Sequence, residues 1–192
     1  MTQPNPSEEE LEPTRDALLA LVPLDSLPRT GWILRGVEAP ESIAGHVIGV
    51  AYVALALCPR VQTREGGPLD FGRVLSMALV HDAPEALSGD IPRPAAAHLP
   101  KGAKRAMEEA LANEVVRPLG PSAGAAWDEY TAQKTREARF VKGCDRLQLG
   151  VRLLAYERAG QRGLDEFWDS WTGEFSEFAC LDALARAILS AR

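Results

Sequence analysis

The chain of 192 residues is long enough for one sizeable domain but not comfortably for two. Hydrophobic residues make up 46% of it and charged residues 25%, as in an ordinary soluble globular protein. The net charge of −6 argues against a partner that is a nucleic-acid polymer, because surfaces that bind one are normally basic, but it leaves room for a small anionic substrate.

The sequence favours a cytoplasmic protein without a membrane partner. The polar, acidic beginning of the chain lacks the basic and apolar regions of a signal peptide, so we expect none. The longest apolar run, VIGVAYVALALC, is too short to cross a bilayer. The three cysteines are odd in number and far apart, which favours reduced thiols (Cys58, Cys144 and Cys180).

Helical periodicity dominates the chain, and the sustained alternation typical of strands is scarce. We expect residues 1–13 to form a flexible N-terminal segment and residues 14–192 to form one all-α domain. The predicted helices cover residues 14–22, 40–58, 66–82, 101–116, 123–130, 135–160, 164–174 and 177–190.

Local signals set the helix boundaries near the centre of the chain. Glu41 suits the first turn of the second helix, where a carboxylate faces the positive end of the helix dipole. Asp70 is a candidate N-cap of the third helix. Pro84 removes a backbone donor and clashes with the preceding turn, so we expect a kink or break just after His81 and Asp82.

Four polar residues interrupt otherwise apolar helices: His46, His81, Asp82 and Asp145. A buried carboxylate needs a cationic or metallic partner, and a lone core histidine is more often satisfied by a hydrogen bond. Two neutral imidazoles and two carboxylates form an N2O2 set of charge −2. Such a set suits one borderline divalent ion such as Mn, Co, Fe, Ni or Zn. One metal explains together four residues that are hard to explain separately.

Two carboxylates follow the His-Asp pair, and each has two interpretations. Glu85 lies four residues after His81, so it is either a solvated charge near a helix end or a carboxylate that handles protons beside a metal. Asp90 lies in SGDIP, where it forms a turn or recognises a sugar hydroxyl. His98, in a proline-rich loop, fits an ordinary surface or loop residue.

These stretches resemble the HD-domain phosphohydrolases, whose signature is H…HD…D, and more narrowly the HD-domain 5'-deoxynucleotidases. The matching stretches are LPRTGWILRGVEAPESIAGH, ALVHDAPEALSGDI and DEYTAQKTREARFVKGCDRLQL, which occur in this order over roughly residues 18–175. The resemblance implies a single HD-domain helical bundle that binds one divalent metal per chain through His46, His81, Asp82 and Asp145. It implies removal of phosphate from deoxyribonucleoside 5'-monophosphates, and a homodimer, since the family is often dimeric.

The resemblance also implies roles for residues around the metal. Glu85 would position or protonate the reacting groups, and Asp90 would lie near the sugar. In RTGWILRG, Arg29 and Arg35 are candidates to bind phosphate with a fork of donors, with Arg35 also favoured for catalysis. Trp32 is a candidate to pack against the nucleoside. A surface arginine and a core tryptophan are the alternatives for this segment.

Three other functions are compatible with the same pattern. The first is an HD-type hydrolase of another nucleotide, either a nucleoside di- or triphosphate or a modified nucleotide. The second is a two-metal HD enzyme, which needs additional histidines where this chain offers only His98. The third is a non-catalytic nucleotide-binding module. It stays open because the family commonly has an acidic residue, a candidate outer partner of the metal ligands, where this chain has Gly45.

Overall fold

The computed structural model of the protein describes residues 6–62, 64, 66–171, 175 and 177–192. Within these residues the structure is helical and contains no β-strand, which confirms the predicted all-α class. The α-helices are α1 (Glu8–Leu21), α2 (Thr30–Ile33), α3 (Ile43–Leu57), α4 (Phe71–Val80), α5 (Glu85–Ser88), α6 (Arg93–Ala96), α7 (Ala103–Val115), α8 (Pro121–Ala132), α9 (Arg136–Arg158), α10 (Asp165–Trp171) and α11 (Ala179–Ser190). Short 3-10 turns are η1 (Val22–Asp25), η2 (Cys58–Arg60) and η4 (Arg117–Leu119).

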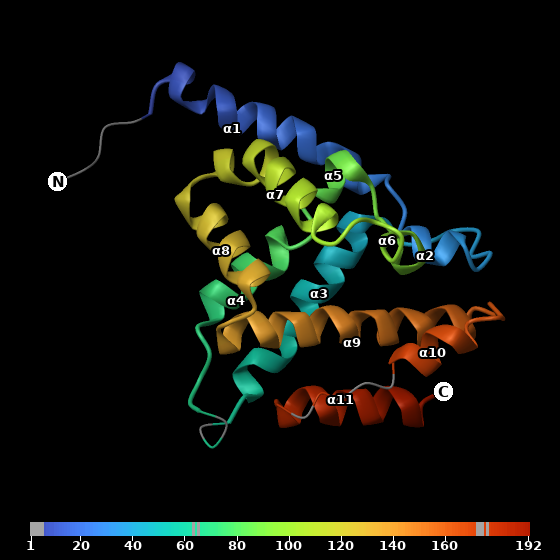
Figure 1. The fold of residues 1–192 in the computed structure, drawn as a ribbon. Coiled ribbons are helices and arrows are strands. Elements are labelled where there is room, and N and C mark those ends of the chain that lie inside the picture. Colours follow the sequence, from blue (N-terminus) through green and yellow to red (C-terminus); the bar gives the residue numbers. More distant parts are fainter. Residues whose placement is uncertain (1–5, 63, 65, 172–174, 176) are drawn as a thin grey trace.

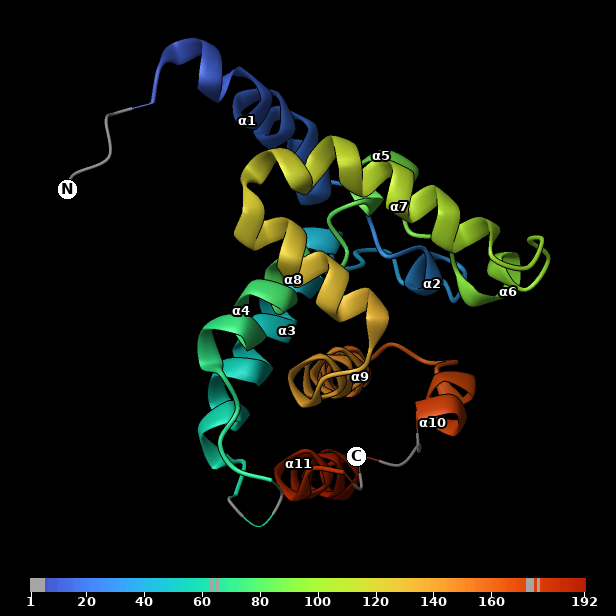
Figure 2. The ribbon, with the colours of Figure 1, turned by 60° about the vertical axis from the view of Figure 1, so that its left-hand side comes forward.

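The long helix α9 is the axis of the fold. It contacts α3, α4, α8, α10 and α11. Figure 2 shows α9 nearly end-on, with α8, α4 and α3 on one side of it and α10 and α11 on the other. The N-terminal helix α1 lies with α5 and α7 at the far end of the molecule from α11 (Figure 1). Because α3, α4 and α9 all pack against one another, polar side chains on their facing surfaces are brought together.

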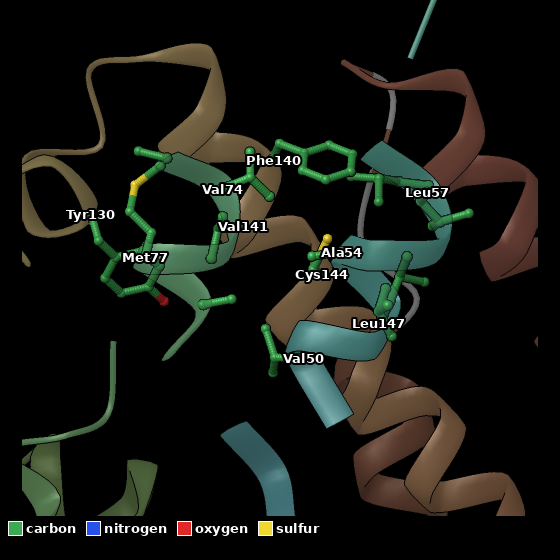
Figure 3. Packing of buried hydrophobic residues seen from close by; sticks show 14 of the residues in the cluster. Val50, Ala54, Leu57, Val74, Met77, Tyr130, Phe140, Val141, Cys144 and Leu147 are labelled. Atoms are coloured by element: carbon green, nitrogen blue, oxygen red, sulfur yellow. The ribbon is translucent and has the colours of Figure 1, made fainter. Parts of the chain in front are cut away.

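One apolar core joins α3, α4, α8 and α9 (Figure 3). Its buried members on these four helices include Val50, Ala54, Leu57, Val74, Met77, Tyr130, Phe140, Val141, Cys144 and Leu147. Each large apolar side chain that is fully buried stabilises the fold by about 1.5–3 kcal/mol. The core therefore fixes the relative positions of the helices that carry the four predicted metal ligands.

The third predicted helix is present as α4 but spans Phe71–Val80 rather than residues 66–82, because a cap and a proline set its ends. Asp70 caps α4, because its Oδ1 accepts a hydrogen bond from Arg73 N at 3.0 Å. α4 ends at Val80, and α5 begins at Glu85 immediately after Pro84. The break predicted from Pro84 is thus confirmed.

The first helix begins earlier than predicted. α1 begins at Glu8 rather than near Thr14, and so it crosses the boundary that we drew at residue 13. The reason is a reciprocal capping box, in which Ser7 and Glu10 each bond the other's backbone N–H. The helix continues through Pro13.

The second predicted helix begins later than expected. Ser42 Oγ accepts a hydrogen bond from Gly45 N at 3.0 Å and caps α3, which therefore starts at Ile43. Glu41 lies before the helix and is buried, so the prediction that it faces the helix dipole from the first turn is wrong.

The remaining predicted helices are present as α7 to α11. The proline-rich stretch predicted as a loop before α7 also contains the short helix α6. Residues 1–5 of the predicted flexible segment and residues 172–174 of the predicted helix 164–174 lie outside the described residues.

One segment, Ile43–Arg60, is long and apolar enough to cross a membrane by length and composition alone. The core helix of a soluble protein passes the same test. Here α3 packs against α4 and α9 and contributes Val50, Ala54 and Leu57 to the core, which accounts for its apolar character.

Candidate metal centre

Three helices bring the four predicted metal ligands to one place. His46 lies near the start of α3, His81 and Asp82 directly follow the last residue of α4, and Asp145 lies in the middle of α9. Both histidines are buried, and the two carboxylates are largely covered. Residues that are far apart in the sequence therefore meet where α3, α4 and α9 pack together.

The donor atoms are spaced as ligands of one ion would be. His46 Nε2 lies 3.2 Å from Asp145 Oδ1 and 3.4 Å from Asp82 Oδ2. His81 Nε2 lies 3.4 Å from His46 Nε2 and 3.4 Å from Asp82 Oδ2. Donors bound at about 2.1 Å to a tetrahedral or octahedral ion are separated by about 3.0–3.4 Å. One donor atom each of His46, His81 and Asp145 lie within 4.8 Å of one another, which fits a single divalent metal, and Asp82 contacts this group through the two imidazoles.

The hydrogen bonds of the two imidazoles support the same conclusion. His81 Nδ1 lies 2.8 Å from the Ala78 carbonyl oxygen, and His46 Nδ1 lies 2.7 Å from Gln148 Oε1. Both partners are acceptors, so each ring carries its proton on Nδ1 and turns the lone pair of Nε2 inward. Two ring nitrogens that face each other beside two carboxylates form a donor set that suits a divalent cation. The donor set therefore fits the predicted metal.

Two cations contact the carboxylates. Arg29 Nη1 lies 3.2 Å from Asp82 Oδ2, and Lys142 Nζ lies 2.8 Å from Asp145 Oδ2. Burial raises the pKa of Asp82, but the two imidazoles and Arg29 outweigh it and hold that pKa below its usual range. Burial also raises the pKa of Asp145, and Lys142 and the imidazoles hold it well below its usual range. Both side chains are thus ionised carboxylates.

Glu85, the first residue of α5, is a buried acid beside this cluster. It is 7% exposed, and its Oε2 has no hydrogen-bond partner in the part of the chain that the structure describes. Burial, followed by the charges of Asp82 and Asp90, raises the pKa of Glu85 to about 9. This burial contradicts the alternative of a solvated charge. Its carboxyl keeps a proton at neutral pH in the metal-free protein.

Asp90 holds the segment that carries Arg29. Its Oδ2 accepts a hydrogen bond from Thr30 N at 2.7 Å, and its carbonyl oxygen accepts one from Thr30 Oγ1 at 2.9 Å. Asp90 therefore fixes the start of α2 and, with it, the arginine that precedes this helix and reaches Asp82. Contact between Asp90 and a sugar stays a prediction.

Trp32 and Arg35 are engaged elsewhere. Trp32 is 1% exposed, its Nε1 donates to Glu41 Oε1 at 3.0 Å, and its ring packs against Phe167. The structure thus supports the alternative of a core tryptophan, because no face is free for a nucleoside. Arg35 pairs with Glu166 on α10 and lies over the ring of Phe167, as the alternative of a surface arginine describes.

Three residues beside the cluster were missed by the sequence-based prediction. Lys142 and Gln148 lie three residues before and after Asp145 on α9, a spacing that places helical residues on neighbouring positions of one face. Gln148 is also 4% exposed, so it is a polar interruption of an apolar helix like His46. Glu41 had been assigned to a helix dipole, and its burial gave no local signal.

Known proteins resemble this chain in sequence and in fold. Residues 23–178 match the family model described as HD domain. The chain is 34% identical over 159 residues to 5'-deoxynucleotidase HDDC2 of Mus musculus, covering 80% of this chain and 75% of that protein. It is 31% identical over 179 residues to 5'-deoxynucleotidase hdd1 of Schizosaccharomyces pombe, covering 88% and 85%. The crystal structure of the PH0347 protein from Pyrococcus horikoshii OT3 superposes with a TM-score of 0.78 at 31% identity, covering 93% of this chain and 99% of that one.

Proposed function

The chain belongs to the HD domain family, and on this premise we propose that it is a metal-dependent phosphomonoester hydrolase acting on deoxyribonucleoside 5'-monophosphates. The observation that carries the proposal is that one donor atom each of His46, His81 and Asp145 lie within 4.8 Å of one another, with Asp82 Oδ2 against both imidazoles. Relatives named 5'-deoxynucleotidases support a small nucleotide substrate, and the deoxyribose and monophosphate follow from the same names.

The four donors, from His46, His81, Asp82 and Asp145, would hold one divalent transition metal per chain, drawn from Mn, Co, Fe, Ni and Zn. When bound, such an ion supplies Lewis acidity, which lowers the pKa of water and polarises a phosphoryl oxygen. Four protein donors leave coordination positions for water and substrate on an ion that accepts six.

Residues of the chain would supply the rest of the chemistry. A water oxygen forms a bond to phosphorus while the bond to the nucleoside O5' breaks, so O5' must gain a proton. Glu85 would donate it and would regain a proton from the attacking water, which must lose one, because its buried Oε2 has no other partner among the described residues and its carboxyl holds a proton at neutral pH. Arg29 would bind the phosphate oxygens with its guanidinium. A catalytic role for Arg35 requires its side chain to leave Glu166.

We further propose that the protein is a cytoplasmic homodimer. α3 exposes Ile48, Tyr52 and Leu55, which share one helix face and are between 48% and 65% exposed. An apolar stripe of this kind suits a self-complementary contact between two copies. Cys58 and Cys144 are buried thiols outside any disulfide, as expected in a reducing compartment. Sedimentation equilibrium of the wild type and of a Tyr52→Glu variant tests the dimer.

The decisive experiment measures product release from ribo- and deoxynucleoside mono-, di- and triphosphates with each of the five metals. We expect inorganic phosphate from deoxynucleoside monophosphates, and none from an Asp145→Asn variant prepared in the same way. Release of pyrophosphate or triphosphate would instead favour a hydrolase of another nucleotide. Tight nucleotide binding without turnover under every metal would favour a binding module. A metal content well above one ion per chain would favour the two-metal enzyme.

A further inference from the structure

We propose that Glu41 and Gln148 form a relay that fixes the ring proton of His46 on Nδ1 and thereby keeps Nε2 open for the metal. These are positioning residues, since neither reaches the donor cluster except through the histidine. The inference rests on the proposed metal centre, but its first consequence, the position of a proton in the metal-free protein, is independent of catalysis.

The relay is a chain of two hydrogen bonds with a defined direction. Gln148 Nε2 donates to Glu41 Oε2 at 2.7 Å, and Gln148 Oε1 lies 2.7 Å from His46 Nδ1. A carboxylate can only accept, so the amide must turn its NH2 group toward Glu41 and its oxygen toward the ring. The oxygen then requires a proton on Nδ1. The carboxylate thus determines, through the amide, which nitrogen of His46 is free.

Glu41 is held firmly enough to impose this direction. Its Oε1 accepts from Trp32 Nε1 at 3.0 Å, and its Oε2 also accepts from Arg152 Nε at 2.8 Å. Its backbone N–H donates to the Tyr156 hydroxyl oxygen at 2.7 Å. Three donors converge on one carboxylate that is 7% exposed. Such a group is an acceptor in a fixed position, and burial makes rotation away from these donors costly.

Gly49 makes the room that the amide occupies. A Cβ added at Gly49 would lie 2.8 Å from Gln148 Cγ and 2.9 Å from its Nε2, closer than such contacts occur. A Cβ added one turn earlier, at Gly45, would meet Ser42 Oγ at 3.4 Å, an ordinary contact. Gly49 has no side chain and therefore leaves the space that the Gln148 amide occupies between Glu41 and His46. The chain also has no need of a carboxylate at Gly45, because α9 provides the outer partner of His46.

The position of the proton matters for metal binding. Without an acceptor at Nδ1, the ring proton would move to Nε2, where Asp145 Oδ1 lies 3.2 Å from His46 Nε2 and would accept it. A metal would then have to displace this proton and break that hydrogen bond. Loss of an outer partner of a metal-bound histidine typically lowers metal affinity by about 10- to 100-fold.

The first test replaces the acceptor without changing its size. In metal-free protein labelled with 15N-histidine, NMR identifies the protonated ring nitrogen, and calorimetry with Mn²⁺ or Co²⁺ gives the affinity. In Glu41→Gln, we expect the amide of Gln148 to turn, the His46 proton to move to Nε2, and metal affinity to fall by about 10- to 100-fold. The double variant Glu41→Gln/Gln148→Glu restores a donor facing an acceptor, and it should return the proton to Nδ1 and the affinity to within about threefold of wild type.

The second test removes the space and has a matched control. Gly49→Ala should displace Gln148 and lower metal affinity by at least about tenfold. Gly45→Ala gains the same helix propensity on the same helix and should bind metal as wild type does. This pair decides the question even if Glu41→Gln does not fold.

The proposal is overturned if the proton stays on Nδ1 and metal binds normally in Glu41→Gln, or if Gly49→Ala and Gly45→Ala behave alike. If metal affinity depends on the relay but the protein releases no phosphate, the proposed function is wrong and the relay is supported. If the protein releases phosphate but none of these variants changes its metal affinity, the relay is wrong and the proposed function is supported.

Discussion

Glu41 and Glu85 are buried to the same extent, 7% exposed each, and Glu41 reaches His46 through Gln148 while Glu85 lies three residues after Asp82. Glu41 accepts hydrogen bonds on both oxygens from Trp32, Gln148 and Arg152. Glu85 Oε2, by contrast, has no partner in the described part of the chain. Equal burial thus produces a fixed acceptor in one place and an acid that keeps its proton in the other. The number of hydrogen-bond donors around a buried carboxyl group thus decides whether it is a fixed acceptor or an acid that keeps its proton.

The two histidines differ in the same way. His81 Nδ1 is held by the carbonyl of Ala78, which belongs to its own helix turn. His46 Nδ1 is held by a side chain 102 positions away in the sequence. A backbone carbonyl cannot be removed by substitution, whereas a glutamine can. The His46 side is therefore the side on which mutation can tune metal affinity without removing a ligand.

The largest effect should come from removing either imidazole, where the two sides must behave alike. His46→Ala and His81→Ala should each reduce turnover to background. Each should also lower metal affinity by more than the ~10- to 100-fold that loss of a hydrogen-bond partner of a metal-bound histidine typically causes. Metal content and phosphate release measure this. His98→Ala removes an exposed histidine and serves as the control. A variant of either ligand with normal metal content would contradict the shared site.

The two buried acids should separate sharply in catalysis. Glu85→Gln should lower kcat by about 10²- to 10⁴-fold with metal still bound, because the proton donor is lost. Glu41→Gln should instead change the metal concentration needed for half-maximal rate. Assays across a metal titration distinguish the two results. Wild-type turnover by Glu85→Gln with metal bound would sink the role assigned to Glu85.

The arginine on each side offers a smaller contrast. Arg29→Met should lower kcat/KM by about 10²-fold at saturating metal, since a guanidinium next to the reacting phosphate is lost. Arg152→Met weakens only the anchor of Glu41, so it should shift metal affinity by about tenfold and leave the rate at saturating metal within about threefold. Steady-state kinetics at several metal concentrations test both, and equal losses of kcat/KM would refute the distinction.

The smallest contrast concerns stability, and here the two substitutions should have opposite signs. The pKa of Glu85 rises from 4.5 to about 9 on folding, so the native state keeps a proton that the unfolded chain has lost. The free energy of unfolding of the metal-free protein should therefore fall as pH rises between these values. Glutamine does not ionise, so Glu85→Gln removes this pH-dependent loss of stability. The variant should be more stable than the wild type by up to about 3 kcal/mol at pH 7.

Glu41→Gln should destabilise the protein by about 1–3 kcal/mol, because buried donors lose an acceptor. Urea unfolding at pH 5, 7 and 9 checks both substitutions. If the Glu85→Gln variant has a lower free energy of unfolding than the wild type at pH 7, the prediction that burial of Glu85 destabilises the native state is wrong.

Much of the fold could be predicted because its signals are local. Asp70 caps the next helix, and Pro84 breaks the chain between α4 and α5. The start of α1 was also readable in principle, since Ser7 and Glu10 form a capping box within four residues. The all-α class followed from periodicity of the same short range.

The candidate site likewise contains residues that local signals reveal and residues whose roles depend on long-range contacts. His46 and Asp145 interrupt apolar helices, and His81 and Asp82 follow the apolar end of α4, so a local pattern reveals all four predicted ligands. Glu41 instead depends on partners 107 and 111 residues later, and Trp32 on packing against Phe167. Sequence periodicity does not encode such pairings, so Glu41 was assigned to a helix dipole and Trp32 was left between a nucleoside contact and a core residue.

The central position of α9 has a consequence for the order of events during synthesis. The ribosome produces His46, His81 and Asp82 well before Asp145 and Gln148, which arrive together on α9. Until that helix docks, the first histidine lacks both its neighbour ligand and the amide that orients its ring. A nascent chain would thus be a poor chelator and would acquire the proposed ion late, after the long-range contacts that define the native topology have formed. Loading with metal would then report that folding is complete.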